Sequence, residues 1–373
     1  MAQTGTFEVK ESRPPPVRDA GPFQWAREHL FGSVTNTIIT LLSLYVLYLL
    51  IPPIVQWALL DANISGSDRS VCEANPDGAC WTFIKVRFTQ IMFGLYFGAN
   101  PDQVWRPVLA MAVFASLIAW LVIPRTPFKP QVGLFTLIGF PVFTYAVVQG
   151  EWLGLPAANL EEWGGFLLTL TLASVGIVAA LPIGILLALG RRSELPIIRA
   201  LSVIYIEFWR GTPLITILFM ASVMLPLFFP SGVDFNKIVR AMVGITLFQS
   251  AYTAEAIRGG LQAMPRGQYE AADALGLGYW KKMIFIILPQ ALRISIPGIV
   301  NTFIALFKDT SLVSIIGLLD LLNMAQTASR SIEWKGYDFE AYVFAAAIFF
   351  ICTYGMSRYS QYIERKLDRE TQR

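Results

Sequence analysis

Long stretches without a charged residue alternate with short polar segments along most of this 373-residue chain. A helix needs about 20 mostly apolar residues to cross a bilayer. The earlier stretches are free of charge, whereas two later ones contain Arg240 and Arg293. The predicted spans are Phe31–Leu60, Val108–Pro124, Gln131–Gly150, Gly164–Gly190, Gly211–Val233, Val239–Thr253, Met283–Phe307 and Ala341–Ser357. The pattern therefore predicts an all-α integral membrane protein with about eight transmembrane helices.

Composition agrees with this fold class and excludes several others. Hydrophobic residues make up 55% of the chain and charged residues only 15%, against about a quarter charged in soluble domains. These values exclude disorder, a fibrous repeat and a typical soluble enzyme. The net charge of +3 is too small to indicate nucleic-acid binding. One histidine and three cysteines leave little for a metal site or a histidine-based catalytic centre.

Lysine and arginine are distributed unevenly over the polar segments. If the N-terminus is cytoplasmic, the segments on that side hold about twice as many of them as the other side. The positive-inside rule then places both termini in the cytoplasm. Residues 1–30 become a cytoplasmic tail without a cleavable signal peptide. Cys72 and Cys80 fall in an external loop over residues 61–106, where a disulfide or two free thiols are the alternatives.

The chain divides near residue 160. Residues 31–160 form a three-span extension, and residues 161–373 form a five-span part. The aromatic segment from Trp81 to Phe97 predicts an interfacial helix lying on the membrane. A long polar interruption, residues 254–282, separates two spans of the second part. Pro265 suits a helix start and Gly276 a helix end, so this loop is expected to contain a short helix. The helix is either solvated or a docking element for a cytoplasmic partner.

The interruption also carries a recognisable motif. Glu270-Ala271-Ala272, then Gly276 after three residues, then Ile286-Ile287-Leu288-Pro289 after nine, resembles the EAA signature of ABC-importer permease subunits. In that family this segment is the coupling helix, which docks into a groove on the ATPase subunit. The resemblance assigns coupling to Pro265, Glu270, Ala271, Ala272 and Gly276.

Three further segments resemble the polar amino acid (His/Glu/Gln/Arg/opine) permeases: Tyr205–Leu214, Ala251–Gly260 and Phe307–Leu312. This resemblance covers about Glu161 to Arg369. The extension is similar to that of the extended subunit of general L-amino acid permeases. The resemblance implies a five-helix type I core in a bacterial inner membrane. It also implies a second permease subunit, two ATPase subunits that bind ATP and Mg, and a periplasmic amino acid-binding protein. No cofactor is implied for this chain itself.

Ionisable groups at membrane depth are functional candidates by default. The predicted substrate pathway comprises Glu207, Gln290, Arg293, Lys308, Asp309 and Thr310. Structural alternatives remain for several of them: a helix-end hydrogen bond for Gln290, an acidic partner for Arg293, and mutual pairing of Lys308 with Asp309. The Lys308–Ser311 segment looks like a break between two half-helices. A second break predicts a gate or hinge, formed by Arg210, Gly211 and Pro213 together with Pro289.

Two other functional classes compete with an ABC importer. A stand-alone secondary amino acid transporter usually shows inverted repeats, whereas here three spans precede five. A membrane enzyme would need metal ligands or a nucleophile with its base, and the sequence contains no zinc motif, nucleophile elbow or P-loop. The sequence leaves open which amino acids are carried, which subunit binds them, and what the extension does.

Overall fold

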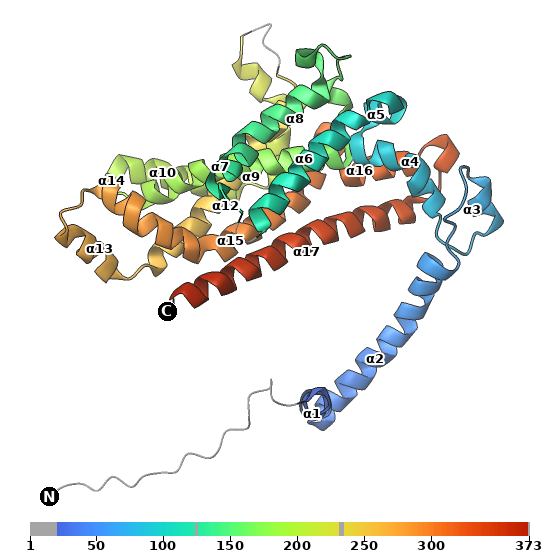
Figure 1. Ribbon diagram of the computed structural model, residues 1–373, viewed down its shortest axis with the longest axis horizontal. Coiled ribbons are helices and arrows are strands. Elements are labelled where there is room, and N and C mark those ends of the chain that lie inside the picture. Colours follow the sequence, from blue (N-terminus) through green and yellow to red (C-terminus); the bar gives the residue numbers. More distant parts are fainter. Residues whose placement is uncertain (1–20, 124–125, 231–234, 372–373) are drawn as a thin grey trace, which may run out of the picture. The chain divides into compact units, whose positions relative to one another are not determined.

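Helices dominate the computed structural model, which describes residues 21–123, 126–230 and 235–371 (Figure 1). Most of the predicted tail 1–30 and the far ends of two predicted spans, at residue 124 and residues 231–233, lie outside the described residues. Within the described ranges there is no β-strand, only isolated bridges. The all-α prediction is confirmed. The chain contacts define two compact units: one extends to Cys80, and the other comprises Ser67–Arg69 and Trp81 onward.

The first unit contains the first predicted span. Its helices are α1 (Pro22–His29), α2 (Val34–Val55) and α3 (Ser70–Ala74). The hydroxyl oxygen of Ser33 caps α2 by accepting the Asn36 N–H at 3.1 Å, which satisfies one of the free donors of the first turn. No side chain of α2 is buried within the chain, as expected for a helix that is apolar on all sides and faces lipid.

A disulfide closes the polar loop that follows α2. Cys72 and Cys80 are bonded, with their Cα atoms 5.5 Å apart, so the predicted bridge is formed. Both cysteines are buried. Two asparagine side chains order the same loop: Asn63 donates to the carbonyl oxygen of Asn75 at 2.9 Å, and Asn75 donates to that of Asp61 at 2.8 Å. The loop is therefore a small folded element.

The second unit packs its helices around two long central ones. Its helices are α4 (Trp81–Phe93), α5 (Leu95–Ala99), α6 (Trp105–Val122), α7 (Lys129–Leu134), α8 (Phe140–Gln149), α9 (Gly165–Arg191), α10 (Pro196–Gly211), α11 (Leu214–Val223), α12 (Lys237–Ala263), α13 (Arg266–Ala274), α14 (Tyr279–Lys282), α15 (Leu288–Asp309), α16 (Leu321–Ser329) and α17 (Asp338–Thr371). The central helices α9 and α12 approach closely because α9 presents glycines to α12. A Cβ at Gly176 would lie 2.6 Å from the Ile245 side chain, and one at Gly184 would lie 2.9 Å from that of Thr253. Small residues allow such close packing of membrane helices.

Among the described residues, five helices are long and apolar enough to cross a membrane, and there is a sixth span if the bent pair α10–α11 is counted as one. The two remaining predicted spans are helical as well. Residues 131–150 correspond to α7 and α8 joined by a π-helical turn, Phe135–Gly139. Residues 239–253 lie in α12, whose charged residues Lys237, Arg240, Glu255 and Arg258 make it more polar than an ordinary span. The prediction of about eight spans agrees with this arrangement.

The predicted extent of one span is wrong. The helix expected over Gly211–Val233 ends at Val223, and a 3-10 turn over Leu225–Phe228 follows. The other half of this span is α10, which the charges of Arg199, Glu207 and Arg210 hide from a search for apolar stretches. Those side chains lie on an amphipathic helix whose apolar face, including Ile197, Leu201 and Ile204, is exposed.

The predicted half-helix break after Lys308 is also corrected. The α-helix ends at Asp309, but the chain continues as a 3-10 turn over Thr310–Ile316 and does not start a second α-helix there. Hydroxyl groups cause the tightening: Thr310 donates to the carbonyl oxygen of Phe307 at 2.8 Å, and Ser311 donates to that of Lys308 at 2.9 Å. Such local bonds compete with the backbone pattern of the α-helix.

Asp320 starts the next helix, α16. Its carboxylate accepts the backbone N–H groups of Leu322 at 3.3 Å and Asn323 at 3.1 Å, which is N-capping by a side chain. Burial raises the pKa of the Asp320 carboxyl, while its hydrogen bonds with Asn323 and Leu322 lower that pKa. Desolvation is the larger of the two effects.

The aromatic segment of the external loop forms helix α4, which is partly buried against other helices. Helix α4 buries Phe83, Ile91 and Phe93 against protein, and Phe83 packs on the fully buried Trp334 with ring centroids 5.6 Å apart. The salt bridge from Arg87 to Glu333, at 2.6 Å, fixes the same contact. One face of α4 thus packs on α16 and the start of α17, while Val86 and Phe88 remain exposed, and the interfacial position stays a prediction. Contacts between helices place α4–α8 in the same compact unit as the five-span part. The domain boundary near residue 160 stays a prediction.

Candidate functional site

The polar interruption folds as the sequence predicts, into the short helix α13 (Figure 1). Pro265 occupies the N-cap position in an extended conformation. At the other end Gly276 has φ +68°, and the N–H of Leu277 donates to the carbonyl oxygen of Ala272 at 3.2 Å. This is the glycine-terminated helix end that a left-handed residue permits. Helix and turn therefore form a local, sequence-determined unit.

Three side-chain contacts attach α13 to the rest of the second unit. Arg192, at the end of α9, donates to Tyr269 at 3.2 Å and also to the carbonyl oxygen of Leu261. Lys282 pairs with Asp273 at 2.5 Å. Gln290 of α15 donates to Gln268 at 3.3 Å. The short helix is therefore connected to α9, α12, α14 and α15, and a displacement of α13 acts on all of them.

The outer surface of the loop combines polar side chains with exposed apolar ones. Ala272 is buried, whereas Glu270 and Ala271 are exposed. Near them Leu275 is 75% and Trp280 61% exposed. Among the described residues, Glu270 forms no ion pair. Exposed large apolar side chains beside an unpaired carboxylate are typical of a protein–protein contact.

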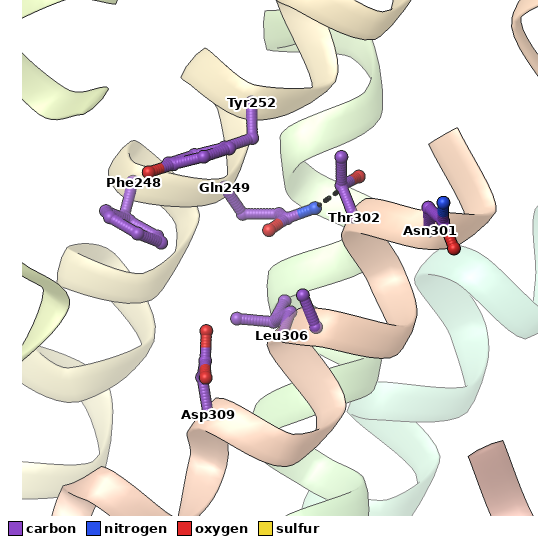
Figure 2. A pocket seen from close by; sticks show the side chains of 8 residues that line it. Phe248, Gln249, Tyr252, Asn301, Thr302, Leu306 and Asp309 are labelled. Carbon is purple, nitrogen blue, oxygen red and sulfur yellow. Dashed lines mark hydrogen bonds between the residues drawn. The ribbon is translucent and has the colours of Figure 1, made fainter. Parts of the chain in front are cut away.

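A cavity of about 370 Å³ lies between α12 and α15, within the size range of small-molecule sites. Its lining residues are Phe248, Gln249 and Tyr252 from α12, and Asn301, Thr302, Ala305, Leu306 and Asp309 from α15. Figure 2 shows Asp309 on one side of this space and the Tyr252 ring on the other. The amide of Gln249 spans the two helices by donating to Thr302 at 3.0 Å. Polar groups from both helices thus converge on one space.

Asp309 is the charged residue of this cavity. Its side chain is half-buried and, within the described part of the chain, makes no hydrogen bond or ion pair. Among the described residues no salt bridge joins Asp309 to Lys308, whose side chain is exposed and does not line the cavity. An unpaired carboxylate in a partly desolvated site attracts a cationic group such as an ammonium.

The other predicted pathway residues lie away from this cavity. Thr310 is fully buried, and its hydroxyl bonds the backbone. Gln290 donates to the carbonyl oxygen of Ile286 at 2.8 Å, which is the helix-end bond named as its structural alternative. Arg293 is exposed, and within the described ranges it has no acidic partner. Pro289 is the second residue of α15 and follows a π-helical turn, Met283–Ile287, as expected where a proline leaves a carbonyl free.

Glu207 belongs to a charge cluster at the junction of α9, α10 and α12. Glu255 is its centre: Arg191 approaches it at 3.0 Å, Arg258 at 2.9 Å and Arg210 at 3.6 Å. Arg191 also pairs with Glu207 at 2.8 Å. The cluster lies next to the predicted hinge, where α10 and α11 are bent by 102°. A Cβ added at Gly211 would have no other atom within 4 Å. Neighbouring atoms therefore do not restrict the backbone at this bend.

Several residues of these sites were not identified from the sequence. Gln249, Asn301 and Thr302 are ordinary polar residues in apolar helices, and no local signal separates them from packing residues. Glu255 and Arg258 stand in a segment that resembles the permease family, yet their three-residue spacing is also typical of a helix-surface ion pair. Arg191 and Arg192 were considered only as topology markers.

These features together define a class of protein: a helical membrane subunit with a substrate-sized cavity and a protruding loop helix for a partner. Comparison with known proteins is consistent with this class. The family model described as binding-protein-dependent transport system inner membrane component matches residues 180–369.

Relatives extend the match to the whole chain. The inner membrane amino-acid ABC transporter permease protein YhdY of Escherichia coli K12 is 50% identical over 359 residues, covering 95% of this chain and 96% of that protein. The glutamate/glutamine/aspartate/asparagine transport system permease protein BztC of Rhodobacter capsulatus is 41% identical, covering 97% and 98%. A shorter relative, the glutamate/aspartate import permease protein GltK of Escherichia coli O6:H1, is 32% identical and covers 54% of this chain and 91% of its own length.

The chain belongs to the binding-protein-dependent transport system inner membrane components, as an amino-acid ABC transporter permease. It is a multi-pass protein of the bacterial inner membrane and is not an enzyme. ATP hydrolysis takes place in a partner ATPase, and a binding protein supplies the cargo. The stand-alone transporter and membrane-enzyme alternatives are thereby set aside.

Proposed function

We propose that the cavity between α12 and α15 is the amino acid site on the translocation pathway of this permease. The observation that carries the proposal is the half-buried, unpaired carboxylate of Asp309 in a cavity of about 370 Å³. An amino acid brings an ammonium group that this carboxylate attracts. Gln249, Asn301 and Thr302 supply neutral donors and acceptors beside it.

We further propose that α13 docks on the ATPase subunit, which binds ATP and Mg. The support is the exposed carboxylate of Glu270 beside the exposed side chains of Leu275 and Trp280. Helix α12 lines the cavity with Tyr252 and ends at Ala263, directly before the loop. One helix therefore connects the two sites, and closure of the ATPases can change access to the cavity.

The proposed assembly is a heterodimer with a second permease subunit around a pseudo-two-fold axis, with two ATPases and both termini on the cytoplasmic side. The binding protein is proposed to contact residues 151–163 and 331–340. Exposed apolar side chains in these loops support such a contact: Trp152 is 66% and Ile332 is 98% exposed.

Transport by the reconstituted complex tests the amino acid site. Asp309→Asn keeps the shape of the side chain and removes the charge, so uptake driven by ATP and the binding protein is expected to fall about tenfold or more. The matched control is Ser314→Ala, an exposed residue of the adjacent 3-10 turn outside the cavity, which is expected to transport like the wild type.

Both variants should assemble with the ATPase, which pull-down of the complex measures. Unchanged uptake by an assembled Asp309→Asn complex would contradict the proposed site.

A further inference from the structure

The loop over residues 331–340, which leads from α16 into α17, combines one outward apolar side chain with a buried one. Ile332 is 98% exposed, whereas Trp334 is fully buried. In the proposed assembly this loop contacts the binding protein, so the position of Ile332 depends on how firmly the rest of the loop is held.

Arg69 holds the loop at two positions. Its guanidinium donates to the carbonyl oxygen of Glu333 at 3.3 Å and lies 5.7 Å from the centre of the Tyr337 ring, a distance at which the ring face attracts a cation. Glu333 and Tyr337 stand on either side of Trp334 in the sequence. A single side chain, which belongs to the same compact unit as the loop, therefore restrains both ends of the turn around Trp334.

Helix α4 holds the same loop from a second segment of the chain. Arg87 pairs with the carboxylate of Glu333 at 2.6 Å. Phe83, one helical turn earlier and so on the same face of α4, stacks with its ring centroid 6.3 Å from that of Tyr337. Glu333 and Tyr337 are thus each held twice, once by Arg69 and once by α4.

All three of these side chains come from the predicted extension. The family match begins at residue 180, so it includes the 331–340 loop but not Arg69, Phe83 or Arg87. The extension therefore adds restraints that the part of the chain matched by the family model does not contain.

We propose that Arg69 is a positioning residue for docking of the binding protein, and that holding the 331–340 loop is one task of the extension. The inference rests on the proposed contact between the binding protein and this loop. Without Arg69 the turn has several conformations, of which only a fraction presents Ile332 to the partner. The apparent affinity then falls in proportion to that fraction, while the bound complex is unchanged.

The experiment separates affinity from turnover. The complex of both permease subunits with the ATPases is placed in nanodiscs. ATP hydrolysis is then measured while the binding protein of the same transport system, saturated with an amino acid that it binds, is titrated. Each variant gives the binding-protein concentration for half-maximal hydrolysis and the maximal rate. The variants are Arg69→Gln, Arg69→Lys, Ile332→Asp and Lys85→Gln, in which an exposed cation of α4 controls for the loss of one positive charge.

Arg69→Gln is expected to raise the half-maximal concentration about two- to fivefold, the size of one exposed cation–π contact. The maximal rate should stay unchanged, because saturating partner selects the competent conformation. Arg69→Lys keeps a cation near the Tyr337 ring and should recover part of the affinity. Ile332→Asp should raise the concentration further, since docking would bury an unpaired charge. Lys85→Gln should behave like the wild type.

The outcomes distinguish the inference from the proposed contact. If Ile332→Asp raises the half-maximal concentration and Arg69→Gln does not, the contact stands and the role of Arg69 is overturned. That role is also overturned if Arg69→Gln lowers only the maximal rate, which is a structural effect, or if Lys85→Gln shifts the concentration equally, which is an effect of overall charge. If Ile332→Asp leaves the concentration unchanged, the binding protein does not dock on this loop and the inference falls with the contact.

Discussion

Helices α2 and α12 differ both in their number of charged residues and in how far their side chains are buried. Helix α2 contains no charged residue and buries none of its side chains in the chain. Helix α12 carries two basic residues in its first turn and the Glu255–Arg258 pair near its end, yet it buries residues along its whole length, from Ile238 to Leu261. A helix without any charged residue is thus unburied within its unit, whereas a helix with several charged residues is central in the other unit.

The difference follows from what surrounds each helix. Lipid demands an apolar surface on every side of α2. The surroundings of α12 are other helices, which satisfy its charges with Arg191 and Arg210. Hydropathy alone does not separate the two surroundings, because the central helix α9 is at least as apolar as α2. The helix that connects cavity and loop is recognised by its polar residues.

The largest expected effect comes from closing the space around α12. A Cβ at Gly260 would collide with the carbonyl oxygen of Ala291 on α15, so Gly260→Leu should cost roughly 3 kcal/mol, the upper end of overpacking. We expect loss of the assembled complex, measured by size-exclusion chromatography. The control is Gly259→Leu, where nothing lies within 4 Å. Equal yields from the two variants would show that α12 is not tightly packed.

A second prediction concerns the turn after α13. Gly276 has φ +68°, a conformation that costs other residues about 1–2 kcal/mol. Gly276→Val should leave the membrane subunits assembled but separate ATP hydrolysis from uptake. Gly267→Val is the control, because Gly267 lies in the adjacent helix α13 without a positive φ or a close neighbour. The ratio of amino acid transported to ATP hydrolysed measures the effect, and a normal ratio in both variants would argue against coupling through this turn.

A smaller effect is expected where α9 holds the end of α12. Arg192→Ala removes the hydrogen bonds to Tyr269 and to the carbonyl oxygen of Leu261. The bond to Tyr269 is exposed to solvent, and Gln268 and Asp273 still attach α13. Transport per ATP should fall only a few-fold. If Arg192→Ala transports as much amino acid per ATP as the wild type, the contacts of Gln268 and Asp273 are sufficient to hold α13.

The smallest effect should come from α2. Leu47 is 48% exposed in a helix without buried residues, so Leu47→Ala should change the midpoint of thermal unfolding very little, as exposed substitutions usually do. Fluorescence-monitored melting of the purified complex measures it. A clear loss of stability or uptake would mean that another subunit packs on α2, and the comparison with α12 would then need revision.

The sequence predicted the local parts of the site well. The loop helix depends on Pro265 and Gly276, whose backbone preferences act within a few residues, and the disulfide depends on two nearby cysteines. The family resemblance then supplied the function. Each of these signals is contained in a short segment of the chain.

The parts that needed the structure depend on contacts between distant segments. Glu255 meets Arg191 and Arg210 only because α9, α10 and α12 converge. The packing of α4 was not foreseen because an apolar aromatic face suits lipid and protein equally well, and only the buried Trp334 shows that Phe83 meets protein. The α10–α11 span was misplaced because its first half is charged.

The packing of α4 has a consequence for how a soluble protein would associate with this surface. Phe83 and Arg87 hold the segment from Ser331 to Lys335 by its tryptophan and its glutamate, while Ile332 points outward at 98% exposure. The conformational entropy of this loop is therefore already lost on folding. A partner that docks there meets an ordered surface, and less of its binding free energy is consumed in ordering the loop.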